Sequence, residues 1–145
     1  MKKQNKPTNE FKMQIPSCSV NESFSRKVCS DFLMPLDPNL SDLSDIRTAV
    51  SEAVTNCIVH AYKEQSGTIY ISGKYFSDRT VHISIKDKGC GIPDVEKAME
   101  PLFTTDTSGE RGGIGFAIMN SFSDRLIVKS SVGKGTKVTM IKKLK

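Results

Sequence analysis

Hydrophobic and polar residues alternate in three short stretches of the chain, and each stretch predicts a β-strand. The first is carried by Phe11, Met13 and Ile15, directly before Pro16. Residues 68–76 and 81–85 follow the same period of two on either side of Ser77-Asp78-Arg79, which predicts a hairpin. Two further strands are predicted near residues 126–129 and 137–141, on either side of the turn from Gly133 to Gly135.

Three other stretches follow a helical period. Apolar residues recur every fourth position from Val20 to Phe32, and Ser19 with Glu22 predicts a capping box at the start of this first helix. The second helix is expected to begin at a Ser41 N-cap and to carry an apolar stripe from Leu43 to about Tyr62. A short third helix is predicted over residues 114–122.

The order β-α-α-β-β-α-β-β predicts an α+β fold, a two-layer sandwich with the helices on one face of a mixed, mostly antiparallel sheet. The chain length of 145 residues suits one domain. Residues 1–9 are polar and are expected to form a disordered leader, so the predicted domain covers residues 10–145.

The formal net charge of +5 suggests a nucleic-acid partner. The six lysines near the two ends account for more than this excess, however, and the rest of the chain is close to neutral; they are Lys2, Lys3, Lys6, Lys142, Lys143 and Lys145. We therefore expect no direct binding of nucleic acid. The sequence also has no apolar run near the roughly 20 residues of a membrane span and no apolar signal core, so a cytoplasmic protein is expected.

Four cysteines are too widely spaced for a CxxC pair, and two of them, Cys29 and Cys57, fall within helical patterns. Reduced thiols in the core are therefore expected, rather than a zinc site or a disulfide framework.

A row of polar residues on the second helix is a candidate for catalysis or metal binding. Glu52, Asn56 and His60 are four residues apart, so they share a row that flanks the apolar stripe. A carboxylate at the edge of a core can serve as a general base, and an amide oxygen one turn later can ligate Mg²⁺. Taken alone, such a row is more often a solvated border than a catalytic site.

Three glycine-containing stretches are weaker signals. Asp87-Lys88-Gly89-Cys90-Gly91 follows a strand, where the carboxylate could accept a hydrogen bond from a ligand's amino group, or could simply form a turn. Glu110 to Phe116 is a glycine-rich approach to a helix, which suits phosphate binding or a flexible loop. Gly133-Lys134-Gly135-Thr136 is most simply a hairpin turn and does not fit a Walker A loop, because glycine follows the lysine.

The order of these stretches within one small domain resembles the GHKL (Bergerat-fold) ATP-binding superfamily. Within it, the chain is most similar to the anti-sigma serine kinases of spore-forming bacteria. The similarity runs from about Phe11 to the end, and its most specific stretches are Asn21-Glu22-Ser23-Phe24, Leu36-Asp37-Pro38, residues 50–56 and Pro101-Leu102-Phe103-Thr104-Thr105.

The resemblance implies roles for single residues. Glu52 would be the general base, and Arg111 would meet the γ-phosphate at the end of an ATP lid that covers residues 101–113. Asn56 would ligate Mg²⁺, and Asp87 with Thr136 would hold the adenine. The other nucleotide-binding positions would be Gly89, Gly91, Thr104, Thr105, Gly113 and Gly115. Arg26 matches an arginine that contacts the sigma factor.

The function implied by this resemblance is twofold. The protein would bind and inhibit sporulation sigma factor F, and with ATP and Mg²⁺ it would phosphorylate a serine of an anti-anti-sigma factor, acting as a homodimer. Two alternatives stay open, namely a related kinase that acts on a stress-response sigma factor and a nucleotide-gated binding module without turnover. A histidine kinase catalytic domain is disfavoured, because residues 1–10 cannot supply a phospho-acceptor helical hairpin.

Overall fold

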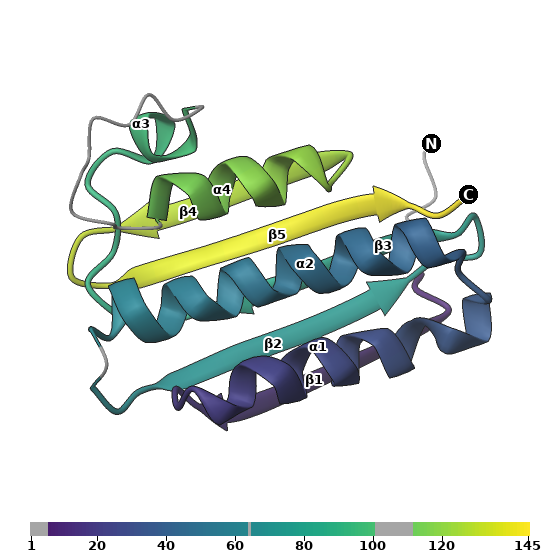
Figure 1. Cartoon of the computed structure of the whole chain (residues 1–145), viewed down its shortest axis with the longest axis horizontal. Coiled ribbons are helices and arrows are strands. Elements are labelled where there is room, and N and C mark those ends of the chain that lie inside the picture. Colours follow the sequence, from purple (N-terminus) through teal and green to yellow (C-terminus); the bar gives the residue numbers. More distant parts are fainter. Residues whose placement is uncertain (1–5, 64, 101–111) are drawn as a thin grey trace.

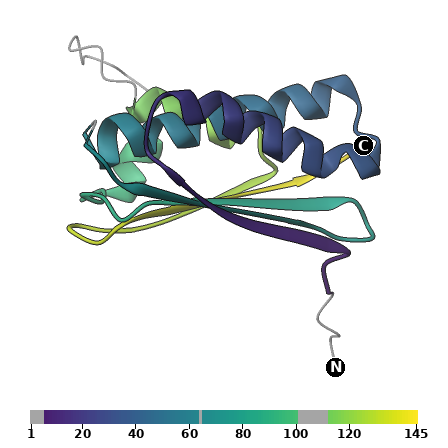
Figure 2. The ribbon, with the colours of Figure 1, turned by 90° about the horizontal axis from the view of Figure 1, so that it is seen from below.

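The computed structural model describes residues 6–63, 65–100 and 112–145. Five strands form one sheet in the order β1-β2-β3-β5-β4 (Figure 1). The strands are β1 (Asn9–Pro16), β2 (Thr68–Tyr75), β3 (Thr80–Lys86), β4 (Arg125–Ser131) and β5 (Gly135–Lys143). All four strand pairs are antiparallel. The described helices cover a single face of this sheet, which confirms the expected two-layer α+β architecture (Figure 2).

The helices are α1 (Val20–Leu33), α2 (Leu40–Asn56), α3 (Val95–Met99) and α4 (Gly112–Ser121). A 3₁₀ turn, Met34–Leu36, leads out of α1, and a π-helical turn, Cys57–Ala61, continues α2. The short helix α3 was not predicted from the sequence. It is only five residues long and depends on one local bond, in which the Asp94 carboxylate accepts the backbone N–H of Lys97 at 3.1 Å.

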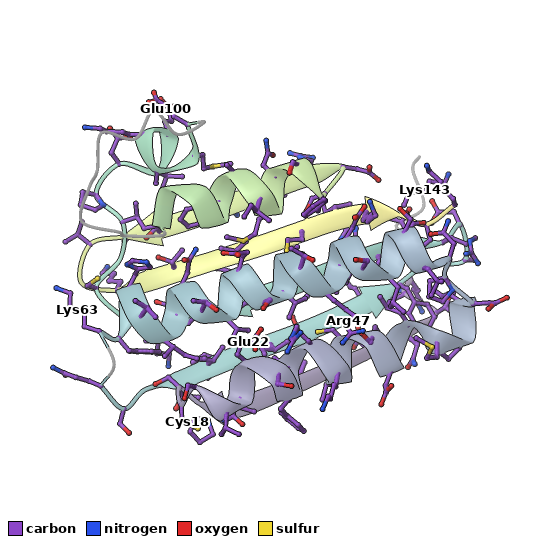
Figure 3. The ribbon with its side chains drawn as sticks, in the orientation of Figure 1. Cys18, Glu22, Arg47, Lys63, Glu100 and Lys143 are labelled. Carbon is purple, nitrogen blue, oxygen red and sulfur yellow. The ribbon has the colours of Figure 1, made fainter. Side chains whose placement is uncertain are left out.

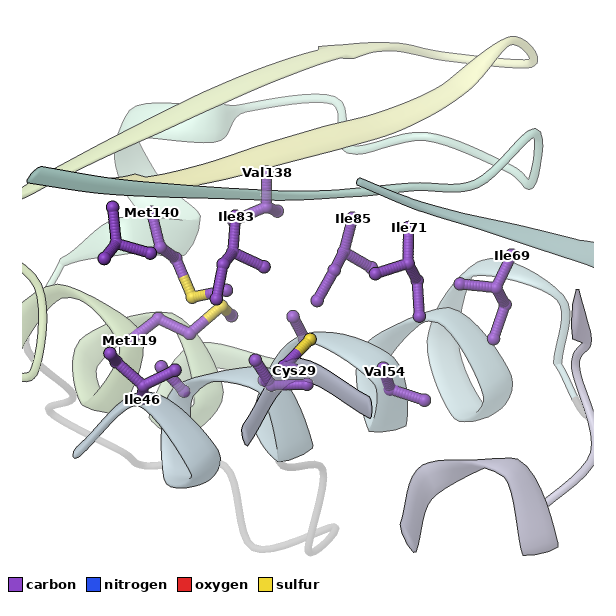
Figure 4. Close-up of a cluster of buried hydrophobic side chains, with 14 of the residues drawn as sticks. Cys29, Ile46, Val54, Ile69, Ile71, Ile83, Ile85, Met119, Val138 and Met140 are labelled. Atoms are coloured by element: carbon purple, nitrogen blue, oxygen red, sulfur yellow. The ribbon is translucent and has the colours of Figure 1, made fainter. Parts of the chain in front are cut away.

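The core lies between the helices and the inner face of the sheet (Figure 4). Alternate residues of β2 and β3 are buried there, as the period of two predicts; they are Ile69, Ile71, Val81, Ile83 and Ile85. They pack with Val50 and Val54 of α2, Cys29 of α1 and Met119 of α4. Burial of each large apolar side chain contributes about 1.5–3 kcal/mol, so this layer holds the two helices of the N-terminal half against the sheet.

The predicted apolar row of α1 is only partly buried: Phe32 packs against the core, but the first half of the row does not. Val20 is 73% exposed and Phe24 is 48% exposed, whereas Ser25, Cys29 and Leu33 are buried. Small residues on the buried face let α1 lie close to α2 and the sheet. The larger apolar side chains of the row are left partly in solvent.

The two predicted helix caps also differ from the structure. Ser19 has a helical backbone conformation and its side chain makes no capping hydrogen bond. Glu22, the expected partner in the capping box, instead accepts from the Ser51 hydroxyl of α2 and pairs with Arg26 at 3.0 Å. The second helix begins one residue before Ser41, because the side chain of Asn39 accepts the N–H of Asp42 at 2.7 Å.

Candidate nucleotide-binding site

The π-helical turn after α2 sets the geometry of the site. The N–H of Tyr62 reaches back five residues to the carbonyl of Cys57, at 3.0 Å. The carbonyl of Ala61 accepts the N–H of Cys90 at 3.1 Å, which ties the end of the helix to the segment after β3. A Cβ atom at Gly89 would lie 2.4 Å from the same Ala61 oxygen, so only glycine permits this approach.

A cavity of about 380 Å³ lies between this helix end, the sheet and α4. Cavities of this size suit small ligands and cofactors. Asn56, His60 and Asp87 contribute polar groups to its wall. Most of the remaining wall is apolar or backbone and includes Ala53, Cys57, Ile85, Gly91, Ile92, Ala98, Phe116 and Val138.

Asp87 is the buried acid of this cavity, with 4% of its surface exposed. Its Oδ1 atom accepts the N–H of Gly89 at 2.9 Å and that of Thr136 at 3.2 Å. Burial raises the pKa of Asp87, and the N–H of Gly89, the Cys57 thiol and the N–H of Thr136 partly oppose this rise. Because both backbone donors bond to Oδ1, Oδ2 retains capacity to accept a ligand's hydrogen bond.

The β4–β5 hairpin holds Thr136 beside Asp87. The Ser130 hydroxyl contacts the Thr136 hydroxyl at 2.8 Å and accepts the N–H of Ile92 at 2.8 Å. Gly135 has φ +115°, and a Cβ atom there would lie 2.1 Å from the carbonyl oxygen of Asp87. Gly91 has φ +77°, and a Cβ atom there would lie 2.1 Å from the carbonyl oxygen of Ser131. Glycine at 91 and 135 therefore allows the two loops to close around the acid.

Glu52 and Asn56 face the first turn of α4. A Cβ atom at Gly115 would lie 3.2 Å from Oε2 of Glu52 and 3.1 Å from Nδ2 of Asn56. Within the described chain, Nδ2 of Asn56 and Nε2 of His60 are buried without a hydrogen-bond partner. Gly113 lies in the same turn of α4, whose first backbone N–H groups have no partner within the helix.

The structure brings together most of the residues predicted for the site. Asn56, Asp87, Gly91 and Thr136 line the cavity, with Gly89 beside them and Gly115 against Asn56. Glu52 lies one turn away and lines a second hollow, between α1 and α2, together with Arg26. Thr104, Thr105 and Arg111 lie outside the described residues.

Two contributors were missed from the sequence. Cys57 lines the cavity beside Asp87 and helps to oppose the rise of the Asp87 pKa, and the Ser130 hydroxyl contacts that of Thr136. The only sequence signal for Ser130 is the Gly133–Gly135 turn, because a hairpin there places Ser130 opposite Thr136. No comparable signal marks Cys57. The four cysteines are free, and only Cys29 and Cys57 are buried, so the expectation of core thiols holds for these two alone.

Comparisons with known proteins agree with this fold. Residues 25–142 match the family described as histidine kinase-like ATPase domain. The fold is similar to that of the RsbU and RsbW domains of Rv1364c from Mycobacterium tuberculosis, with a TM-score of 0.69 at 21% identity over 95% of this chain and 33% of the other. The catalytic domain of histidine kinase ThkA matches with a TM-score of 0.57 at 17% identity, over 92% of this chain and 96% of the other. The fold and the cavity thus define a nucleotide-binding domain of the histidine kinase-like ATPase class.

Relatives with higher sequence identity to this chain indicate which group within this class it belongs to. The anti-sigma F factor of Caldanaerobacter subterraneus subsp. tengcongensis is 50% identical over 92% of this chain and 93% of its own. That of Geobacillus kaustophilus is 46% identical over 92% of each chain. The chain therefore belongs to the anti-sigma F factors within the histidine kinase-like ATPase family. In the described part of the chain, the helices are all too short or too polar to span a membrane.

Proposed function

We propose that this protein binds and inhibits sporulation sigma factor F and, with ATP and Mg²⁺, phosphorylates a serine of an anti-anti-sigma factor in the cytoplasm. The position of Glu52 on α2 gives the strongest support for this function. It lines the hollow between α1 and α2, while Asn56, one turn later, lines the cavity beside Asp87. A protein hydroxyl entering from the hollow would therefore meet a carboxylate next to the bound nucleotide.

The cavity supports the nucleotide half of the proposal. Asp87 would accept the adenine amino group through Oδ2, with the Thr136 hydroxyl beside it. The apolar wall around Ile92 and Phe116 would cover the faces of the base. The glycines at 89 and 91 would let the chain pass the nucleotide closely, and Gly113 and Gly115 would bring the N–H groups of α4 toward its phosphates.

Asn56 fits a magnesium ligand. It lines the cavity, and its amide nitrogen is buried with no partner in the described chain, so the amide can turn its oxygen toward an ion. Bound Mg²⁺ would neutralise phosphate charge. Glu52 would orient the attacking hydroxyl and accept its proton, and Arg111 together with the lid residues Thr104 and Thr105 would contact the phosphates. Phosphoryl transfer depends mainly on such positioning and charge neutralisation.

The hollow between α1 and α2 supports the protein-binding half. It measures about 460 Å³ and contains two arginines, Arg26 and Arg47, beside the apolar Leu40 and Leu43. Arg47 and Glu22 both lie between the two helices (Figure 3). This mixture of guanidinium groups and exposed apolar surface suits a protein partner with acidic residues. We assign the sigma-factor contact to Arg26 and expect a homodimer.

Phosphoryl transfer tests the kinase role. The protein is incubated with labelled ATP, Mg²⁺ and the anti-anti-sigma factor of the same organism, and mass spectrometry locates the modified residue. We expect a phosphoserine that is lost with Glu52→Gln and retained with Glu10→Gln, a matched change on the far face of the sheet. Absence of transfer by the wild-type protein, or full transfer by Glu52→Gln, contradicts the kinase role and favours a binding module.

Affinity for the sigma factor tests the second role. Titration of labelled sigma factor F with ATP present should give saturable binding that weakens with Arg26→Ala and not with Lys27→Ala, its exposed neighbour. Saturable binding of a stress-response sigma factor in place of sigma F would favour the related kinase instead. Light scattering of the same sample measures the mass and so tests the homodimer.

A further inference from the structure

The sheet face opposite the helices carries a concentration of positive charge. In Figure 2 this face lies below the strands, and the described helices all lie above. Outward side chains alternate with the buried ones along each strand. Among these outward positions seven are basic and one, Glu10, is acidic; the basic residues are Lys12, Lys74, Lys86, Arg125, Lys129, Lys137 and Lys143. This excess is larger than the net charge of +5 of the whole chain.

Three of these lysines stand side by side across neighbouring strands. Lys86 of β3 is directly opposite Lys137 of β5, and Lys137 is directly opposite Lys129 of β4. Like charges in directly opposed positions destabilise a sheet. The ion pairs recorded for the described residues join none of these three lysines to an acid. Binding of an anionic partner would therefore reduce the repulsion between these three lysines.

A hollow of about 590 Å³ lies on the same face, beside this row. Lys12, Lys86 and Lys137 line it together with Tyr70, Ser72 and Ser84. The Lys86 ammonium lies 5.8 Å from the centre of the Tyr70 ring, and the Lys88 ammonium lies 5.0 Å from it. An aromatic ring thus stands among several ammonium groups at the edge of a recess.

We propose that this face binds single-stranded nucleic acid. The lysine row contacts successive phosphates, and a base enters the hollow against Tyr70. A positively charged surface combined with an aromatic ring is the chemistry by which proteins bind unpaired strands without sequence preference. Lysine suits this purpose because its ammonium binds phosphate as a point charge.

An anionic membrane is a less suitable partner for this face than a single nucleic-acid strand. The large apolar side chains exposed in the described chain, such as Phe24 and Leu40, belong to helices or loops and not to the outward face of the strands. An acidic protein would not need a recess beside a tyrosine. The sequence led us to expect no nucleic-acid binding, because counting charges along the chain assigns the excess to its two ends. Such a count does not show which charged residues share one face of the sheet.

Fluorescence anisotropy with a labelled oligothymidylate at several salt concentrations tests the proposal. We expect the logarithm of the affinity to fall linearly with the logarithm of the salt concentration. The triple variant Lys86→Gln/Lys129→Gln/Lys137→Gln should bind at least about tenfold more weakly, with a salt slope smaller by about 2, since each phosphate contact on a single strand contributes about 0.7. Tyr70→Leu should weaken binding with the slope unchanged.

Two matched triple variants provide the controls. Lys27→Gln/Lys63→Gln/Lys97→Gln removes the same charge outside the sheet and should leave binding unchanged. Lys2→Gln/Lys3→Gln/Lys6→Gln tests the charge near the N-terminus. The sheet-face triple should also raise the midpoint of thermal unfolding, because it removes repulsion between neighbouring strands, so a loss of binding cannot be ascribed to unfolding.

Three results would overturn the proposal. The first is no binding by the wild-type protein, and the second is an equal loss in either control triple. The third is binding to phosphatidylglycerol vesicles, or to duplex DNA, that is tighter than binding to the single strand. None of these results bears on ATP binding or phosphoryl transfer, which use the opposite side of the sheet.

Discussion

Gly115 in α4 lies so close to Asn56 of α2 that a Cβ atom added to the glycine would stand 3.1 Å from the Asn56 amide nitrogen. The same atom would stand 3.2 Å from a carboxylate oxygen of Glu52. The absence of a side chain at this one position therefore keeps the proposed base and the proposed magnesium ligand in place.

Gly115→Ala should separate stability from activity. Alanine in a helix is favoured over glycine by about 0.5–1 kcal/mol, so the free energy of unfolding should stay equal or rise. Phosphoryl transfer should nevertheless fall about tenfold or more, because displacing Asn56 and Glu52 spoils the alignment. Chemical denaturation and the transfer assay measure the two effects. Ser121→Ala, at the exposed end of the same helix, is the control, and equal transfer by both variants would contradict the assignment.

Asp87 should make stability depend on pH in a defined direction. Burial raises the pKa of Asp87 in the folded protein above its ordinary value of 3.8. The folded state therefore binds this proton more tightly than the unfolded state does, so the stabilisation from protonated Asp87 is complete below pH 3.8 and is lost as pH rises through the raised pKa. Asp87→Asn does not titrate. The wild-type free energy of unfolding, relative to that variant, should increase as pH falls from neutral toward 3.8 in urea titrations, and a constant difference would contradict the raised pKa.

Lys142 should matter for stability although its neighbour Lys143 should not. The Lys142 side chain is 14% exposed, and its ammonium lies 3.4 Å from a carboxylate oxygen of Asp45 and 3.8 Å from one of Asp42. Lys142→Met leaves the buried Asp42 carboxylate without this cation and should lower the free energy of unfolding by about 1–3 kcal/mol. Lys143→Met, on the exposed face, should change it by less than about 0.5 kcal/mol. Urea denaturation of the two variants gives the comparison, and equal effects would contradict the burial of Lys142.

The cysteines should report occupation of the cavity. Cys18 and Cys90 are exposed, and Cys90 lines the cavity, whereas burial raises the pKa of Cys29 to about 12 and also raises that of Cys57. Because thiolates are the reactive form, a maleimide should label only Cys18 and Cys90 in the native protein. ATP should slow labelling of Cys90 and leave that of Cys18 unchanged, as followed by mass spectrometry. Equal protection of both thiols, or of neither, would place the nucleotide elsewhere.

The elements of this fold could be predicted from the sequence because each depends on a local period. The alternation around Ile69–Ile71 and Ile83–Ile85 marks the strands within one residue of the observed bounds. The apolar stripe marks the long helix, which reaches its predicted end once the π-helical turn after α2 is included. Three candidate site residues could also be predicted from local features. Glu52 and Asn56 share a helical spacing, and Asp87 stands at the end of a strand. Local patterns failed at α1, where helix packing buries the small Ser25 and leaves Phe24 exposed.

Contacts between residues far apart in the sequence become visible only in the folded structure. The π-helical turn joins Ala61 to Cys90, and the hairpin places Thr136 on Asp87. Strand order and register place Lys86, Lys137 and Lys129 in one row, although more than forty residues separate the first two. The local patterns of the sequence predict where strands and helices form and which residues are candidates for a nucleotide site. They do not predict which helix face is buried, which strands pair or how charge gathers on one face of the sheet. These properties depend on contacts between distant segments, and such contacts leave no periodic pattern in the sequence.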